Sequence, residues 1–327
     1  MSEDSSATVS PGRPLSLFVL PSRPGLSWGF LGVLAFSFTV PLTRLALGSG
    51  HLSPLFVGSA RAVVAALLAG LALWFSQSPR PRGREWIGVG VVAAGAVLGF
   101  PLLTSIALTQ TPASHGAVVI ALLPATTAIV SVVRTGERPG RMFWVTSAGG
   151  AVAAVLFAAV QGHTFGQLQA ADVLLFAAVI VCALAYAEGG ILSRRLGAWQ
   201  TISWALLATA PVTVLLTGWA VVDQPPAGTP AEWLAFAYLG VVSMFLGFVA
   251  WYRGLAIGPL AQVSQIQLAQ PVMSIGWAAL ILHESITWPT LLGGVAVVAC
   301  ALVAVRSRTR PSSTLRRHAH SGDRVGQ

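Results

Sequence analysis

The chain has 327 residues, of which 55% are hydrophobic and 9% are charged, and its mean hydropathy is +0.76. A soluble domain carries about 25% charged residues, so this composition excludes a water-facing surface over most of the chain and indicates lipid as its surroundings. The net charge of +9 comes from arginines that lie mainly between apolar runs, so no nucleic-acid partner is expected.

The N-terminal residues 1–26 are mostly polar and predict a disordered cytoplasmic tail. The apolar run Leu15–Leu20 is too short to span a membrane and lacks a small-residue cleavage site, so we expect no signal peptide. Ten apolar segments follow, each near the roughly 20 residues that a spanning helix needs. They lie at about 27–47, 54–76, 86–108, 114–134, 142–160, 171–193, 200–221, 232–252, 260–282 and 287–305.

These segments predict an all-α polytopic membrane protein, because barrel strands would alternate apolar and polar residues and these do not. If the ten helices alternate in direction, almost every arginine falls on the side of the two termini, including the basic tail 306–327. Only Arg44 and Arg61 lie outside this pattern, both within apolar segments. The positive-inside rule then places both termini in the cytoplasm and the protein in the plasma (inner) membrane.

The fourth and ninth segments share a pattern of anchors that indicates internal duplication. An opening proline, a central proline and a closing glutamate recur at one spacing of 147 residues. The pairs are Pro112 and Pro259, Pro124 and Pro271, and Glu137 and Glu284. Upstream, Leu-Gly-Phe occurs at 98–100 and again at 246–248. We therefore predict two repeats, 27–160 and 171–305.

Each predicted repeat contains five helices, an odd number, so the second repeat enters the membrane from the opposite face. Inverted repeats of this kind commonly build secondary transporters with a site near the middle of the membrane. Pro124 and Pro271 are predicted helix breaks, because proline lacks the N–H that the carbonyls of Ile120 and Gln267 would otherwise accept. These breaks are either ordinary kinks satisfied within the bundle or part of the wall of a pathway.

The ninth segment is unusually rich in amides. At 100° per residue, Gln267, Gln270 and Ser274 share one face, and Gln262 and Gln265 form a neighbouring stripe. These side chains either hydrogen-bond neighbouring helices or line a polar cavity, and their number favours the cavity. Amides donate and accept hydrogen bonds, so they suit a neutral or zwitterionic solute.

His115 and Arg61 are added to the predicted substrate pathway, and His115 and Glu188 are the possible proton-linked residues. His115 is either an interfacial histidine or a proton-linked group, and Arg61 either snorkels to the headgroups or contacts an anion or carboxylate. Glu188 either pairs with Arg194 or Arg195 or is proton-linked.

Four further residues receive predicted roles. Thr126 on the fourth segment and Tyr252 on the eighth are added to the predicted substrate pathway. Glu137 and Glu284 are expected to cap the N-terminus of the helix that follows each of them.

Motifs of enzymes and cofactor sites are missing from the sequence. His283-Glu284 is not followed by the second histidine of a zinc protease, and there is no P-loop or dinucleotide fingerprint. Cys182 and Cys300 lie within apolar runs and are expected to be core residues. We therefore expect no enzyme activity, no metal and no cofactor.

The residues Gly247–Ala256 (GFVAWYRGLA), the proline-centred ninth segment and Leu282-His283-Glu284 resemble the second repeat of the EamA-type family of the drug/metabolite transporter superfamily. Arg61 within SARAVVAALL is similar to an arginine common in the second helix of that family, and the fourth segment resembles its first repeat. The likeness covers about residues 27–305, although FSFTVPLTR in the first segment departs from the family pattern. The resemblance implies a central cavity between the repeats and transport of small metabolites such as amino acids.

The sequence thus predicts a secondary transporter that exports a small organic metabolite by alternating access. The alternative is a membrane scaffold or sensor that uses the same fold without transport. An intramembrane enzyme is disfavoured because few acids and histidines lie at mid-membrane depth. A small-molecule substrate and the lipid bilayer are the expected partners, and a homodimer is a further hypothesis.

Overall fold

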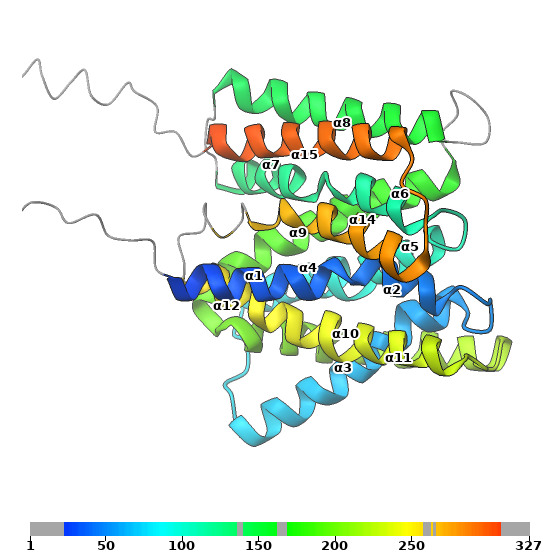
Figure 1. Ribbon diagram of the computed structural model, residues 1–327. Helices are drawn as coiled ribbons and strands as arrows, with labels where there is room; N and C mark the ends of the chain where they lie inside the picture. Colours follow the sequence, from blue (N-terminus) through cyan, green and yellow to red (C-terminus); the bar gives the residue numbers. More distant parts are fainter. Residues whose placement is uncertain (1–22, 136–139, 162–168, 258–262, 264–265, 309–327) are drawn as a thin grey trace, which may run out of the picture.

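The computed structural model describes residues 23–135, 140–161, 169–257, 263 and 266–308, and these residues form helices and no strand (Figure 1). The first half contains α1 (Arg23–Ser37), α2 (Thr39–Ala46), α3 (Pro54–Ser76), α4 (Glu85–Val92), η1 (Ala93–Gly99), α5 (Phe100–Ala107), α6 (Ala113–Ile120), α7 (Leu123–Thr135) and α8 (Arg141–Gln161). The second half contains α9 (Ala170–Leu196), α10 (Ala198–Asp223), α11 (Pro230–Tyr238), η2 (Leu239–Leu246), α12 (Gly247–Ile257), α14 (Ala269–Leu282) and α15 (Trp288–Arg308). The all-α prediction is confirmed for the described residues.

Several of these helices follow one another closely enough to form longer apolar segments. Within the described residues, 7 helical segments are long and apolar enough to cross a membrane: Pro24–Ala46, Pro54–Ser76, Glu85–Ala107, Ala113–Arg134, Ala170–Leu196, Ala198–Asp223 and Pro230–Ile257. Shorter apolar helices occupy Arg141–Phe157, Ala269–Leu282 and Trp288–Val303. Together these segments and helices lie where the sequence predicts apolar segments, while the count of ten spans stays a prediction.

The principal helix contacts join corresponding parts of the two halves. α3 packs on α10, α8 on α15 and α6 on α14, and each of these pairs joins one apolar segment to the corresponding segment of the other repeat. α1 packs on α12, and α5 packs on α9, so the contact between the first and eighth segments is matched by one between the third and sixth. This reciprocal pattern is what a two-fold relation between repeats requires. Figure 1 shows α8, α15 and α7 stacked at one side of the bundle and α3 with α10 at the other.

A second sign of duplication is a π-helical stretch at the same place in each half. η1 ends at Gly99, within the first Leu-Gly-Phe motif, and η2 ends at Leu246, the first residue of the second motif. A π-helical turn is rare and is found frequently at functional sites. Its presence in both halves supports the repeat pattern that the sequence predicts.

Glycines allow α1 and α12 to approach with their backbones almost in contact. A Cβ atom added to Gly254 would lie 2.6 Å from the nitrogen of Gly29, and one added to Gly32 would lie 2.8 Å from the nitrogen of Trp251. Small residues at helix contacts are typical of membrane proteins, where close packing rather than water expulsion drives association. The glycines therefore fix the first helix of one repeat against the eighth segment.

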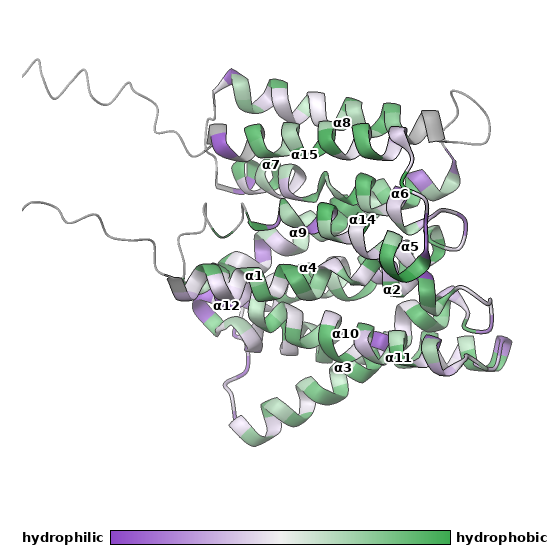
Figure 2. Ribbon diagram, viewed as in Figure 1, coloured by the Kyte–Doolittle hydropathy of each residue, from purple (hydrophilic) through white to green (hydrophobic). Residues whose placement is uncertain are grey.

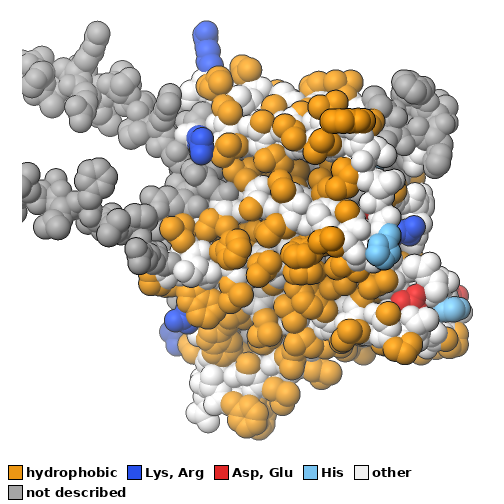
Figure 3. Space-filling model, in the orientation of Figure 1, with side chains coloured by type: hydrophobic (Ala, Val, Ile, Leu, Met, Phe, Trp, Pro, Cys, Tyr) orange, Lys and Arg blue, Asp and Glu red, His pale blue; other side chains and the backbone are white. Residues whose placement is uncertain are grey.

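The outer surface of the bundle is apolar over its middle. Figure 2 shows hydrophobic residues along the helices, and in Figure 3 hydrophobic side chains cover most of the visible face. Trp74, Leu215 and Val222 are 80%, 74% and 85% exposed. Soluble monomers rarely expose apolar surface of this extent, so this surface is suited to contact with lipid chains.

Candidate functional site

Three of the apolar segments are broken, each shortly before a proline. The first segment divides at Phe38, which precedes Pro41, and the fourth divides between α6 and α7, next to Pro124. The ninth turns just before α14, whose third residue is Pro271. Proline lacks an N–H and its ring clashes with the carbonyl four residues earlier, so each break has a local cause in the sequence.

The three breaks surround one small cavity. Its lining residues come from α2, α6, α7 and α14 and the turns beside them. They are Val40, Ala117, Ile120, Leu123, Pro124, Gln267, Gln270, Pro271 and Ser274. The cavity has room for about one water molecule. The cavity lies between the fourth and ninth segments, at one of the contacts between the two halves.

Two amide groups in the cavity wall are buried without partners. Gln267 and Gln270 are 3% and 6% exposed, and neither Nε2 of Gln267 nor Oε1 of Gln270 has a hydrogen-bond partner among the described residues. A buried polar group without a hydrogen bond is unfavourable by about 1–3 kcal/mol. One donor and one acceptor are thus held ready at a place where a polar solute could satisfy both.

The break in the first segment is satisfied by the ninth. Pro41 leaves the carbonyl of Ser37 without its helical partner, and the hydroxyl of Ser274 donates to that carbonyl at 2.7 Å. The indole Nε1 of Trp277 donates to the hydroxyl of Ser37 at 3.0 Å. The Trp277 ring stacks on Phe38 with centroids 4.4 Å apart. Sequence reasoning missed this contact, although Pro41 is the same signal as the two prolines that it used.

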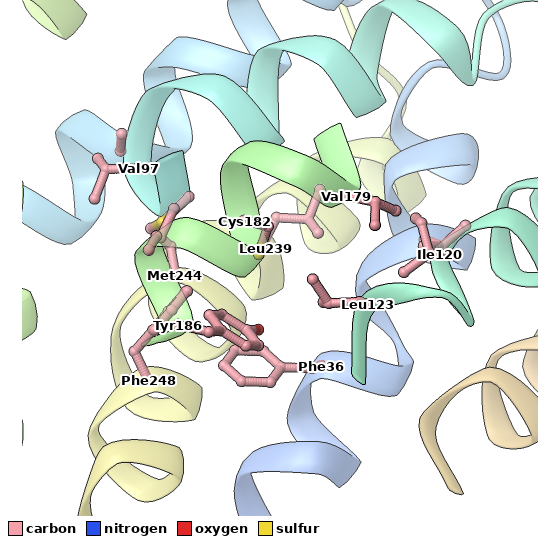
Figure 4. Close-up of a cluster of buried hydrophobic side chains, with 14 of the residues drawn as sticks. Phe36, Val97, Ile120, Leu123, Val179, Cys182, Tyr186, Leu239, Met244 and Phe248 are labelled. Atoms are coloured by element: carbon pink, nitrogen blue, oxygen red, sulfur yellow. The ribbon is translucent and has the colours of Figure 1, made fainter. Parts of the chain in front are cut away.

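Ile120 and Leu123 connect the cavity to an apolar cluster. Figure 4 shows their side chains beside Val179, with Phe36, Tyr186 and Phe248 farther along the same cluster. The rings of Phe36 and Phe248 pack edge to face with centroids 4.9 Å apart. Tightly packed side chains therefore adjoin the cavity on this side.

The other predicted pathway residues lie in several places. Gln262 and Gln265 lie outside the described residues. The hydroxyl of Thr126 donates to the carbonyl of Leu122 at 3.0 Å, within the break of the fourth segment. Tyr252 is fully buried between α12 and α9, where its hydroxyl donates to the carbonyl of Ala185 at 3.4 Å, and it is not among the cavity residues.

Arg61 lies deep in the bundle on α3. Its side chain is 1% exposed, so it does not snorkel to the surface in this structure. Its Nη1 donates to the hydroxyl of Thr43 on α2 at 3.5 Å. Its Nε and Nη2 have no hydrogen-bond partner among the described residues.

His115 forms a buried hydrogen bond to Asp172 that the sequence pattern does not predict. Its Nε2 lies 2.7 Å from Oδ1 of Asp172, and the two residues are 7% and 2% exposed. The other carboxylate oxygen of Asp172 accepts from the backbone N–H of Gln169, which closes a capping box at the start of α9. The ring of His115 also lies against Phe157 at 5.0 Å. A proton-linked role of His115 stays a prediction.

Glu188 pairs with a different arginine from those expected. Its carboxylate accepts from Nε and Nη2 of Arg134 at 3.0 and 3.3 Å, not from Arg194 or Arg195. The reason is tertiary: α7 packs along α9 and brings Arg134 across from Glu188. A proton-linked role of Glu188 likewise stays a prediction.

Glu284 caps a helix of the other repeat. Ala113 and Ser114 are the first two residues of α6, and their backbone N–H groups donate to the carboxylate of Glu284 at 2.8 and 2.9 Å. The expectation that it caps the helix after it, α15, was therefore wrong. A carboxylate at a helix N-terminus satisfies unpaired N–H groups and the helix dipole, so this contact fastens the two broken helices together. Glu137 lies outside the described residues.

No group of three or more histidine, cysteine, aspartate or glutamate residues that could hold a metal ion occurs in the described part of the chain. Cys182 is buried and Cys300 is partly buried, and both are free thiols.

Comparison with known families decides the relationship. The model of the EamA-like transporter family matches residues 23–159 and 169–306, once for each half. The chain belongs to the EamA-like transporter family. Family membership makes it a multi-pass membrane transporter of the drug/metabolite type and not an enzyme. The two matches coincide with the two halves that share the proline anchors and the π-helical stretches.

Curated relatives of this EamA-like chain are named as transporters or exporters. An uncharacterized transporter, YdeK, of Bacillus subtilis (strain 168) is 44% identical over 279 residues, covering 85% of this chain and 96% of that protein. A probable terminal-alkyne amino-acid exporter of Streptantibioticus cattleyicolor is 26% identical, covering 85% and 92%. The aromatic amino acid exporter YddG of Ancylobacter novellus is 26% identical, covering 76% and 81%. A solved crystal structure with TM-score 0.58 and 21% identity covers 90% of this chain and 98% of its own, and it supports the fold alone.

Proposed function

We propose that this EamA-like protein is a secondary transporter that exports a small organic metabolite, such as an amino acid or a related compound, by alternating access. The observation that carries the proposal is the cavity between the fourth and ninth segments, where Nε2 of Gln267 and Oε1 of Gln270 are buried without a hydrogen-bond partner among the described residues. Intramembrane polar groups of this kind tend to mark the path of a solute.

The chemistry of the cavity supports a neutral or zwitterionic solute. Its polar lining residues are Gln267, Gln270 and Ser274, which offer donors and acceptors without a fixed charge. The names of two distant relatives, a probable amino-acid exporter and an aromatic amino acid exporter, agree with this class. The small volume of the cavity fits a closed state, and alternating access would widen it as one half moves against the other.

The proposed arrangement has ten spans in two inverted repeats, with both termini in the cytoplasm of the cell and the protein in the inner membrane. In Figure 1, α1 begins and α15 ends at the same end of the bundle. The arginines of the predicted cytoplasmic loops, such as Arg80, Arg134 and Arg195, agree with this orientation.

Solute counterflow in liposomes tests the proposed function. Purified protein would be reconstituted into liposomes loaded with one unlabelled amino acid at a time, and uptake of the same labelled amino acid would be followed. We expect at least one amino acid to accumulate transiently above the level in protein-free liposomes. No accumulation of any amino acid or related compound, together with a stably copurifying protein partner, would instead favour the scaffold or sensor alternative.

A further inference from the structure

Arg61 is an unusual residue for an apolar helix, about two turns from the N-terminal end of α3. Charged side chains in membrane segments are rare and are normally paired with an opposite charge or with backbone carbonyls. Arg61 is 1% exposed, yet its described neighbours provide no carboxylate and only one hydroxyl, that of Thr43 at 3.5 Å. A buried, permanently charged guanidinium therefore remains largely uncompensated by the protein.

The unpartnered atoms of Arg61 form a defined binding edge. Nε and Nη2 lie side by side on one edge of the planar guanidinium, and their N–H bonds point in nearly the same direction. This edge binds a carboxylate through two parallel hydrogen bonds. The chain contains an example, because Nε and Nη2 of Arg134 donate to the two oxygens of Glu188 at 3.0 and 3.3 Å. Arg61 presents the same pair of donors with no carboxylate of the described residues facing them.

The helix that Arg61 contacts, α2, carries polar residues and also lines the cavity. Thr39 and Thr43 lie one turn apart on α2, and the hydroxyl of Thr39 is bonded to that of Ser243 on η2 at 2.7 Å. Val40, on the same short helix, lines the cavity. α2 therefore contacts the guanidinium of Arg61 through Thr43 and lines the cavity through Val40.

We propose that Arg61 binds the carboxylate of the transported solute through Nε and Nη2, while the amides beside the cavity bind the rest of the molecule. This inference rests on the proposed function and specifies its substrate class as carboxylates with one negative charge, free or zwitterionic. A single guanidinium matches one charge, whereas a phosphate with nearly two charges would require further cations. Among the described residues, Arg44 on α2 is also close in sequence to Thr43, but its guanidinium donates to the carbonyls of Leu108 and Thr109.

Ligand-dependent thermal stability of the purified protein tests the proposal. The probes are the twenty amino acids and a set of simple monocarboxylates, each compared with its own carboxamide. Carboxamides keep the shape of the acid and remove the charge. At a hundredfold excess over Kd, a bound acid should raise the unfolding midpoint by about 5 °C, and its carboxamide should raise it far less.

Variants assign the effect to the residue. Arg61→Met should abolish the stabilisation by the acid while leaving the midpoint without ligand unchanged or higher, because an uncompensated buried charge has been removed. Arg61→Lys keeps the charge but loses the paired donors, so stabilisation should be weaker than in the unaltered protein. Arg44→Gln removes one positive charge from the neighbouring helix and should leave the difference between acid and amide intact.

Three results would overturn the proposal: no carboxylate stabilises the protein, acid and amide stabilise it equally, or the stabilisation survives in Arg61→Met. A large fall in the midpoint of Arg61→Met without ligand would show a structural role and would overturn it as well. These readouts require no flux. A protein that shows counterflow but no preference for acids would refute the carboxylate site alone, and a protein that binds acids without any counterflow would refute transport alone.

Discussion

Replacing Asp172 with alanine is expected to lower the free energy of unfolding by about 2–4 kcal/mol, because it removes the shared acceptor of two hydrogen bonds and each buried group left unsatisfied costs about 1–3 kcal/mol. Asp172 lies 2.7 Å from His115, and its second oxygen accepts the N–H of Gln169 at the start of α9. The alanine variant therefore leaves a buried imidazole and a backbone donor without partners. Unfolding of the purified protein in detergent, followed by thermal or denaturant titration, measures the loss.

Asp223 provides the matched control for this prediction. It is the last residue of α10 and is exposed, so Asp223→Ala should change the free energy of unfolding by no more than about 0.5 kcal/mol. Asp172→Asn should lie between the two, because its amide can still accept from Gln169 or contact His115. Equal stability of Asp172→Ala and Asp223→Ala would show that the buried pair does not stabilise the fold.

Replacing Gln267 or Gln270 with leucine is expected to reduce solute counterflow about two- to tenfold in each case. A hydrogen bond to the solute contributes about 0.5–1.5 kcal/mol, and the loss of 1.4 kcal/mol is tenfold in a binding constant. The apolar side chain would also remove the polar surface that lets a solute enter the cavity. The unfolding midpoint should stay constant or rise, because a buried polar group without a partner is removed.

Gln110→Leu is the control for the glutamine variants. Gln110 is exposed in the loop between α5 and α6, so its replacement should leave counterflow unchanged. Normal flux in both Gln267→Leu and Gln270→Leu would place the solute path elsewhere. Loss of flux accompanied by a lower midpoint would point to a structural role for these amides.

Periodicity and repetition predict much of the architecture. The anchors at Pro112, Pro124 and Glu137 recur 147 residues later, and α6 of the fourth segment packs against α14 of the ninth in the structure. The helical spacing of Gln267, Gln270 and Ser274 predicts a common face, and all three line one cavity. Such features depend on local geometry, which a sequence specifies directly.

Contacts between distant segments were harder to predict. Sequence reasoning gave Glu188 the arginines nearest to it in the chain, whereas the packing of α7 on α9 supplies Arg134. The pairing of His115 with Asp172 is not predictable from spacing either, because the two residues lie 57 positions apart and become neighbours only when α6 and α9 meet. Glu284 caps α6, 170 residues earlier, for the same reason. None of these partners follows from spacing within one helix.

Backbone irregularities form a second class that sequence reasoning missed. The π-helical stretches η1 and η2 have no signature in composition, and only their coincidence with the Leu-Gly-Phe motifs relates them to the duplication. The break at Phe38 did have a signal in Pro41, as the other two breaks have in Pro124 and Pro271. Pro211, by contrast, lies inside the unbroken helix α10, so a proline within an apolar segment permits a break without requiring one.

Labelling of paired cysteines from one side of the membrane tests the inverted arrangement most directly. Arg80 and Ala227 are exposed loop residues 147 positions apart, the spacing of the repeat, and each would be changed to cysteine in a chain carrying Cys182→Ala and Cys300→Ala. In intact cells, a membrane-impermeant maleimide should label the cysteine at 227 at once and the cysteine at 80 only after permeabilisation. Labelling of both positions from the same side would contradict the inverted repeats on which the transport mechanism depends.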